Sequence, residues 1–187
     1  MISSSEGGPA LVVALDMLGR AFEHIGARHV VVGGIAVIAW SHPRSTIDID
    51  CLVATQFLAP EELRASLLAD GFSSGGEIHR DVMMAGFRLL SSGDPARAIP
   101  VDVLVSDNPV VAEIVSRATT KSFAGICIKV PALEDLIVLK LQAQRRQDIA
   151  DCEALIAVCR DQLDWQLLAR QAAAFDVSTL LASLLSP

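Results

Sequence analysis

Hydrophobic residues recur with two different periods along the chain. From Ala10 to Gly26 they stand three and four positions apart, which predicts an amphipathic helix that ends at the glycine. His29 to Val32 is a short β-branched run, and Gly33-Gly34 separates it from a second helical pattern over Ile35 to Trp40. The sequence therefore predicts a strand, a glycine turn and a helix in succession.

Strict alternation of apolar and polar residues predicts a strand from Ile47 to Val53. Asp48 and Asp50 share one of its faces with Leu52, and the other face is apolar, with Ile47, Ile49, Cys51 and Val53. Repulsion between two carboxylates at about 4 Å costs on the order of 4 kcal/mol at an effective dielectric of 20. The pair therefore needs either a cation or free exposure to water.

A second strand, Ile99 to Val105, has one charged residue, Asp102, inside its apolar run. Asp102 is either a ligand in a functional site or the structural partner of an arginine such as Arg88. Upstream, Pro60 to Gly71 predicts a helix. The region after it gives weaker signals, with a hairpin expected around Ala85-Gly86 between strands at 82–84 and 87–90.

Helical periodicity dominates the C-terminal part. Asn108-Pro109 begins a helix, Ile126 to Val130 is the last expected strand, and from Pro131 the apolar spacing supports three or four helices. The predicted fold class is therefore α/β (α+β), a mixed sheet flanked by helices with a C-terminal helical lobe. We expect residues 1–9 to be a flexible tail, 10–130 the α/β core and 131–187 a helical lobe packed on that core.

Composition excludes several classes of protein. The 187 residues carry a net charge of −7, which argues against general electrostatic coating of nucleic acid. Tyr is absent and aromatic residues make up 4%, so a base-stacking platform is not expected either. Apolar runs stay shorter than the roughly 20 residues that span a bilayer, and the N-terminus has no basic region typical of a signal peptide, so we expect a cytoplasmic protein without membrane contact.

Cysteine and histidine spacing gives no zinc motif. The four cysteines form no CxxC pair and the four histidines form no HxxxH or HExxH pattern. We therefore expect reduced thiols without structural zinc.

One spacing stands out as a candidate site. Gly33-Gly34 is followed after thirteen residues by Asp48-Ile49-Asp50, with Arg44 and Thr46 immediately before the aspartates. A diglycine turn lets backbone amides approach phosphate oxygens closely, and carboxylate oxygens are ligands that Mg²⁺ prefers. Together these features favour a nucleotide and metal site over a strand whose aspartates only face solvent.

This pattern resembles the nucleotidyltransferase superfamily of the DNA polymerase β type. The superfamily signature begins with an apolar residue followed by Gly-Gly or Gly-Ser. Asp-x-Asp or Asp-x-Glu follows after nine to thirteen residues. A third carboxylate lies on a later strand, and here it is Asp102. The resemblance implies Mg²⁺ (or Mn²⁺) held by the catalytic carboxylates Asp48, Asp50 and Asp102. It also implies nucleotide binding by Gly33, Gly34, Arg44, Thr46, Lys140 and Asp148.

A downstream segment narrows the resemblance, which covers about Val30 to Leu155. Val130 to Lys140, followed by Arg145, Asp148 and Asp151, looks like the branch that contains the toxin-type nucleotidyltransferases of toxin–antitoxin and phage-defence systems. In that branch the lysine points into the nucleotide cleft, and the downstream arginine and aspartate positions line it. The alternatives are a solvated helix lysine and surface ion pairs among the downstream charges.

The expected function is transfer of a nucleoside monophosphate from a nucleoside triphosphate to a hydroxyl of RNA, a protein or a small molecule such as an aminoglycoside or lincosamide antibiotic. A cognate antitoxin or toxin protein is an expected partner. One alternative is a non-catalytic nucleotide- or partner-binding module of the same fold. Another is a structural protein that uses its C-terminal leucines, Leu180, Leu181, Leu184 and Leu185, as a partner surface.

Overall fold

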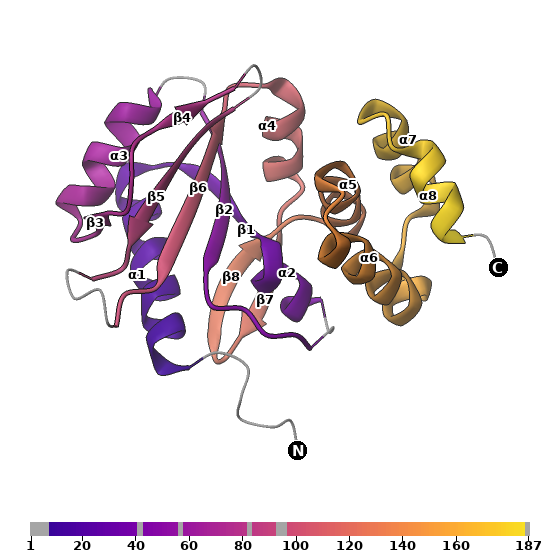
Figure 1. Ribbon diagram of the computed structural model, residues 1–187, viewed down its shortest axis with the longest axis horizontal. Coiled ribbons are helices and arrows are strands. Elements are labelled where there is room, and N and C mark those ends of the chain that lie inside the picture. Colours follow the sequence, from indigo (N-terminus) through magenta and orange to yellow (C-terminus); the bar gives the residue numbers. More distant parts are fainter. Residues whose placement is uncertain (1–7, 41–42, 56–57, 82–83, 93–96, 186–187) are drawn as a thin grey trace.

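A mixed β-sheet with helices on both faces forms the centre of the computed structural model, which describes residues 8–40, 43–55, 58–81, 84–92 and 97–185 (Figure 1). Its strands follow the order β1 (Arg28–Val32), β2 (Ile49–Ala54), β6 (Pro100–Ser106), β5 (Ala85–Leu90) and β3 (Ser73–Ser74), and β4 (His79–Arg80) also pairs with β5. Strands β2 and β6 run parallel, while the other paired strands run antiparallel. The predicted fold class is confirmed.

One face of the sheet is the main hydrophobic core. Alternate residues of β2, β5 and β6 point into it, as strand geometry requires, and they pack against α1 (Pro9–Ile25) and α3 (Pro60–Ala69). The strand residues are Ile49, Cys51, Val53, Ala85, Phe87, Leu89, Val101, Val103 and Val105. Gly26 follows α1 in the left-handed conformation (φ 73°) and ends that helix, as predicted.

The opposite face of the sheet is only partly covered. Val30 and Leu52 pack there against α4 (Pro109–Ser116), whose N-terminus is capped by the side chain of Asn108. Asp50, Asp102 and Arg88 come from strand positions on this same face, because they alternate with the core residues. The fold therefore leaves the charged positions of β2, β5 and β6 on the side that is less covered.

The chain then forms a hairpin and a group of helices. Strand β7 (Thr119–Phe123), which sequence reasoning did not predict, pairs with the expected strand β8 (Ile126–Val130). The helices are α5 (Leu133–Ala143), α6 (Arg146–Cys159), the 3-10 turn η1 (Arg160–Gln162), α7 (Trp165–Ala174) and α8 (Ser178–Leu185). Figure 1 shows them gathered at the end of the molecule away from α3, and their buried side chains belong to the same hydrophobic cluster as the sheet.

Two local predictions were wrong. Ile47 was placed on the apolar face of a strand, but pairing starts at Ile49, so Ile47 lies before the ladder and is 79% exposed. Ala85-Gly86 was expected to be a hairpin turn, but both residues lie inside β5, where they pair with β4 and β6. The expected partner strand at 82–84 falls largely outside the described residues.

Two further findings concern the helices and the cysteines. None of the helices in the described ranges combines the length and apolar character needed to cross a membrane. The cysteines are free thiols, and Cys51, Cys152 and Cys159 are buried while Cys127 is exposed.

Candidate active site

Three carboxylates converge at one end of the parallel strand pair. Asp50 on β2 lies directly opposite Asp102 on β6, and Asp48 lies two residues before Asp50, immediately before the strand begins. One oxygen atom of each side chain lies within 4.8 Å of the others, and all three residues are partly buried. Parallel pairing in this register explains the convergence, because directly opposite residues of neighbouring strands share a face.

The carboxylate cluster disfavours the ionised form of Asp50. The pKa of Asp50 is raised to about 6, first by burial and then by the charges of Asp48 and Asp102, against the smaller opposing effects of Arg145 and Lys140. A divalent cation would relieve this repulsion, and hard carboxylate oxygens are what such a cation binds. The three residues therefore fit a Mg²⁺ or Mn²⁺ site in both geometry and chemistry.

The two glycines bring the aspartate strand close to the β1–α2 turn. Gly33 begins α2 (Gly33–Ala39) with φ 62°, and a Cβ atom there would lie 2.7 Å from Cγ of Asp50. A Cβ atom on Gly34 would lie 2.8 Å from Oγ1 of Thr46. Only glycine allows both approaches, and the first also requires a left-handed backbone. The diglycine thus packs against the carboxylate strand itself.

Thr46 and Arg44 support this strand from the preceding loop. The Thr46 hydroxyl donates to Oδ1 of Asp48 at 3.0 Å and so orients that carboxylate. Arg44 donates from Nη1 to Oδ2 of Asp151 at 2.6 Å and ties the loop to α6. The structure places both residues at the site, where Thr46 faces Asp48 and Arg44 faces Asp151.

Lys140 lies at the centre of a buried charged network. Its Nζ donates to Asp148 at 3.0 Å and to Asp151 at 2.7 Å, and the lysine side chain is only 5% exposed. The alternative of a solvated helix lysine is therefore wrong. Arg145 also donates to Asp148, at 2.6 Å. Burial opposes ionisation of Asp148, but hydrogen bonds from Arg145 and Lys140 outweigh it and lower its pKa.

The network has three cations and two anions. Arg44, Lys140 and Arg145 face Asp148 and Asp151, which leaves one positive charge in excess beside the carboxylate cluster. Both Lys140 and Arg145 act electrostatically on Asp50. The space beside Asp50 can therefore hold an anionic group next to the carboxylates.

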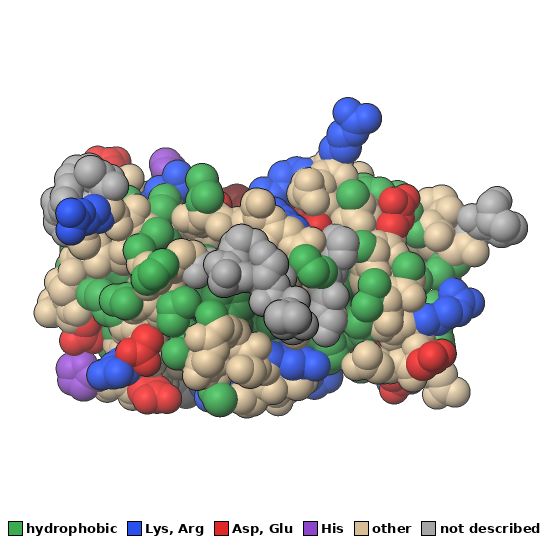
Figure 2. All heavy atoms as spheres, turned by 90° about the horizontal axis from the view of Figure 1, so that it is seen from below, with side chains coloured by type: hydrophobic (Ala, Val, Ile, Leu, Met, Phe, Trp, Pro, Cys, Tyr) green, Lys and Arg blue, Asp and Glu red, His purple; other side chains and the backbone are tan. Residues whose placement is uncertain are grey.

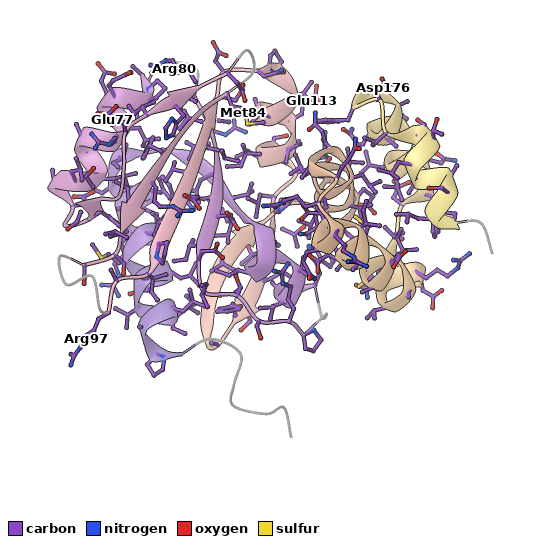
Figure 3. All side chains as sticks on the ribbon, viewed as in Figure 1. Glu77, Arg80, Met84, Arg97, Glu113 and Asp176 are labelled. Atoms are coloured by element: carbon purple, nitrogen blue, oxygen red, sulfur yellow. The ribbon has the colours of Figure 1, made fainter. Side chains whose placement is uncertain are left out.

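A cavity of about 270 Å³ opens beside Asp50 between the sheet and α5. Its polar end is formed by Gly33, Asp50, Lys140, Gln142, Arg145 and Asp148. Its apolar walls come from both sides and consist of Val32, Leu52, Met84, Leu104, Leu136, Leu139 and Ala143. Figure 3 places Met84 near α4, so the cavity extends from the carboxylates towards that helix.

Two further residues lie at this site, although sequence reasoning assigned them only secondary roles. Arg88 on β5 lies opposite Asp102 and donates to both of its oxygens, from Nε to Oδ1 at 2.7 Å and from Nη2 to Oδ2 at 2.6 Å. This is the ion pair considered as an alternative for Asp102. Asp151, one of the downstream aspartates that the resemblance places along the cleft, is completely buried.

The fold is shared with known nucleotidyltransferases. An antigenic nucleotidyltransferase-like protein from Paracoccidioides brasiliensis has a TM-score of 0.54 at 18% identity, over 96% of this chain and 93% of that one. The antibiotic-resistance factor ANT(2'')-Ia gives 0.57 at 15% identity, over 92% and 94%. The lincosamide antibiotic adenylyltransferase LnuA, bound to lincomycin, gives 0.53 at 16% identity, over 78% and 96%.

Sequence comparison identifies the family. No curated protein matches the chain. A family model described as "nucleotidyl transferase of unknown function (DUF2204)" matches residues 12–181, which include the three aspartates, the diglycine and the buried lysine network. The superfamily resemblance seen in the sequence is thus confirmed, and the chain belongs to the DUF2204 family of nucleotidyl transferases.

Proposed function

We propose that the protein is a metal-dependent nucleotidyltransferase that moves a nucleoside monophosphate from a nucleoside triphosphate to a hydroxyl acceptor. The observation that carries this proposal is the convergence of Asp48, Asp50 and Asp102 beside a cavity with a cationic end. Membership of a nucleotidyl transferase family supports it. A strand that merely exposed its aspartates to solvent would not need the close approach of Gly33 to Asp50.

Asp48, Asp50 and Asp102 are the residues that would hold Mg²⁺ or Mn²⁺. When bound, a pair of such ions supplies Lewis-acid stabilisation of the attacking and leaving oxygens of an in-line displacement at phosphorus. Thr46 fixes the orientation of Asp48 through its hydroxyl, and Gly33 allows the Asp50 carboxylate to lie against the turn. The chain thus prepares the ligand positions through its own packing.

The cavity accommodates a nucleotide in one orientation. Its polar end, near Lys140 and Arg145, attracts the phosphates, and the backbone of Gly33-Gly34 is close enough to contribute amides. Its walls of Leu52, Leu104 and neighbouring aliphatic residues suit the nucleoside. The triphosphate would therefore lie beside the carboxylates with its nucleoside between the sheet and α5.

The reaction follows from this placement. The acceptor oxygen forms a bond to the α-phosphorus while the bond from that phosphorus to the bridging oxygen breaks, and pyrophosphate leaves. We assign Asp102 to take the proton of the acceptor hydroxyl, because its carboxylate belongs to the cluster and is 27% exposed. Lys140 and Arg145 offset negative charge that develops on the leaving phosphates.

Charge distribution bears on the acceptor. On the face drawn in Figure 2, the described Lys and Arg side chains are interspersed with Asp and Glu and do not form one stripe, and the whole chain is acidic. This favours an acceptor recognised locally, such as a folded RNA end, a protein side chain or a small molecule, over a long nucleic acid held by its backbone. The sequence resemblance to toxin-type enzymes adds a cognate antitoxin to the proposed partners.

Transfer of label from an α-³²P-labelled nucleoside triphosphate tests the proposal. Total RNA, cell protein and aminoglycoside or lincosamide antibiotics serve as separate acceptors, and pyrophosphate release is followed in parallel. The proposal expects metal-dependent transfer to one acceptor class, abolished in Asp48→Ala/Asp50→Ala. Asp102→Asn should retain nucleotide binding but lose transfer. Nucleotide binding without transfer to any class, and without pyrophosphate release, would instead support the non-catalytic binding module.

Growth arrest on induced expression tests the toxin hypothesis separately. Arrest by the native chain, relieved in Asp48→Ala/Asp50→Ala, would support it. Unchanged growth with the native chain would exclude a toxin role for it in that host.

A further inference from the structure

The carboxylate cluster already contains a cation of its own. The Arg88 guanidinium binds Asp102 through two parallel N–H···O bonds of 2.7 and 2.6 Å, which engage both carboxylate oxygens. Asp48, in contrast, accepts its 3.0 Å hydrogen bond from the neutral hydroxyl of Thr46. The three ligand positions are therefore unequal, since only Asp102 is held in a two-point ion pair with an arginine among the described contacts of the cluster.

We propose, as an inference that rests on the proposed function, that Arg88 is a positioning residue. It keeps Asp102 oriented in the nucleotide-free protein and delays cation binding at Asp102 until a nucleotide arrives. A cation that binds Asp102 shares oxygens that already accept Arg88 hydrogen bonds, and it also meets the repulsion of the guanidinium. Asp48 and Asp50 carry no such competitor in the described contacts. The first cation thus binds at Asp48 and Asp50, and the second competes with Arg88.

The surroundings of Arg88 allow it to be displaced. Its side chain is 53% exposed on the less covered face of the sheet, whereas that of Asp102 is 27% exposed. The guanidinium can therefore turn from Asp102 into water without crossing a packed core. A triphosphate favours this exchange, because its oxygens add ligands for the second cation and offer the guanidinium a new anionic partner.

A neighbouring glycine leaves room for the Arg88 side chain in its bonded position. The backbone N–H of Gly75 donates to the carbonyl of Arg88 at 3.0 Å, and a Cβ atom on Gly75 would lie 2.8 Å from Cγ of Arg88. Gly75 is not in the left-handed conformation, so backbone freedom does not explain the absence of a side chain there. The space left by Gly75 is occupied by the stem of Arg88.

Binding of Mn²⁺ alone, followed by electron paramagnetic resonance of the free ion, tests this inference. Arg88→Gln should tighten the weaker Mn²⁺ site by roughly fivefold to tenfold, as expected when a unit positive charge is removed a few ångströms from a divalent cation in largely aqueous surroundings. The matched control is Arg80→Gln. Arg80 lies on β4 near α3, away from the carboxylate cluster, and pairs with Glu61 (Figure 3).

A pair of glycine variants makes the same test without changing charge. Gly75→Ala should displace the Arg88 side chain and tighten the weaker site in the same direction, whereas Gly76→Ala, with nothing within 4 Å of its Cβ position, should have no effect. A non-hydrolysable nucleoside triphosphate should remove the difference between the native chain and Arg88→Gln. Arg88→Lys should lie between them, because an ammonium does not reproduce the two-point bond.

Identical Mn²⁺ isotherms for the native chain and Arg88→Gln would overturn the inference, as would an equal change in Arg80→Gln. Failure of the proposed function gives a different result. In that case Mn²⁺ binding by the native chain would be absent or would be unchanged in Asp48→Ala/Asp50→Ala.

Discussion

Replacing Asp50 by Asn should stabilise the metal-free protein, although it removes a proposed metal ligand. The pKa of Asp50 is raised to about 6, above its usual 3.8, because of burial and the neighbouring carboxylates. A group whose folded-state pKa is raised binds a proton more tightly in the folded protein than in the unfolded chain. Stability therefore falls as pH rises from about 4 to about 6 and stays lower above that range.

The size of this effect follows from the shift. A change of about two pKa units corresponds to about 3 kcal/mol at 1.36 kcal/mol per unit. Partial exposure of Asp50 to water reduces the net gain to about 1–2 kcal/mol. For a chain of this length that gain corresponds to an increase of roughly 2–8 °C in the melting temperature.

Thermal unfolding in excess chelator, measured between pH 4 and pH 8, provides the assay. Asp50→Asn should match the native chain near pH 4 and exceed its melting temperature above pH 7. Added Mg²⁺ should raise the melting temperature of the native chain more than that of the variant. Asp107→Asn, an exposed aspartate after β6, is the control and should show no such pH dependence.

A gain for Asp50→Asn that did not vary with pH, or no gain at pH 8, would refute the reasoning. Either result would mean that burial and the neighbouring carboxylates do not disfavour the ionised form of Asp50 in the folded protein.

Two further substitutions test the packing that positions the site. Gly33→Ala should destabilise the protein by at least about 2 kcal/mol and abolish metal-dependent nucleotide binding, because its Cβ would overlap the Asp50 carboxylate. The control is Gly26→Ala, which has a similar φ but open space around the Cβ position. It should lose only about 1 kcal/mol of stability and keep nucleotide binding. Equal losses in chemical denaturation would contradict the steric argument. Asp151→Ala should lower the free energy of unfolding by about 3 kcal/mol, because it leaves Lys140 and Arg44 without a shared buried carboxylate. The control is the exposed residue Asp161. A loss no larger than that of Asp161→Ala would count against the buried network.

Local sequence signals were sufficient for most of the secondary structure. The 3.6-residue period of α1 and the glycine after it, the alternation of β2 and the apolar run of β6 are each encoded within the element itself. The carboxylate cluster also followed from local pattern together with the resemblance, since both aspartate strands could be recognised separately. Their adjacency in the sheet then depends on pairing of β2 with β6.

Contacts set by register and by burial were not predictable in the same way. The sequence named Arg88 only as one possible partner of Asp102. The contact depends on antiparallel pairing of β5 and β6 in one register, and a shift of one residue would turn Arg88 to the other face. Strands β3 and β4 have two residues each, too few for a periodic signal. Similarly, the spacing of Lys140, Asp148 and Asp151 allowed surface ion pairs, and only the packing of α5 on α6 buries them.

Calorimetry of nucleoside triphosphate binding in the presence and absence of Mg²⁺, for the native chain and Asp48→Ala/Asp50→Ala, tests the central claim most directly. The account predicts binding of at least one of the four triphosphates that requires Mg²⁺ and is lost in the variant. Failure of all four to bind with Mg²⁺ present, or binding that is unchanged in the variant, would contradict it.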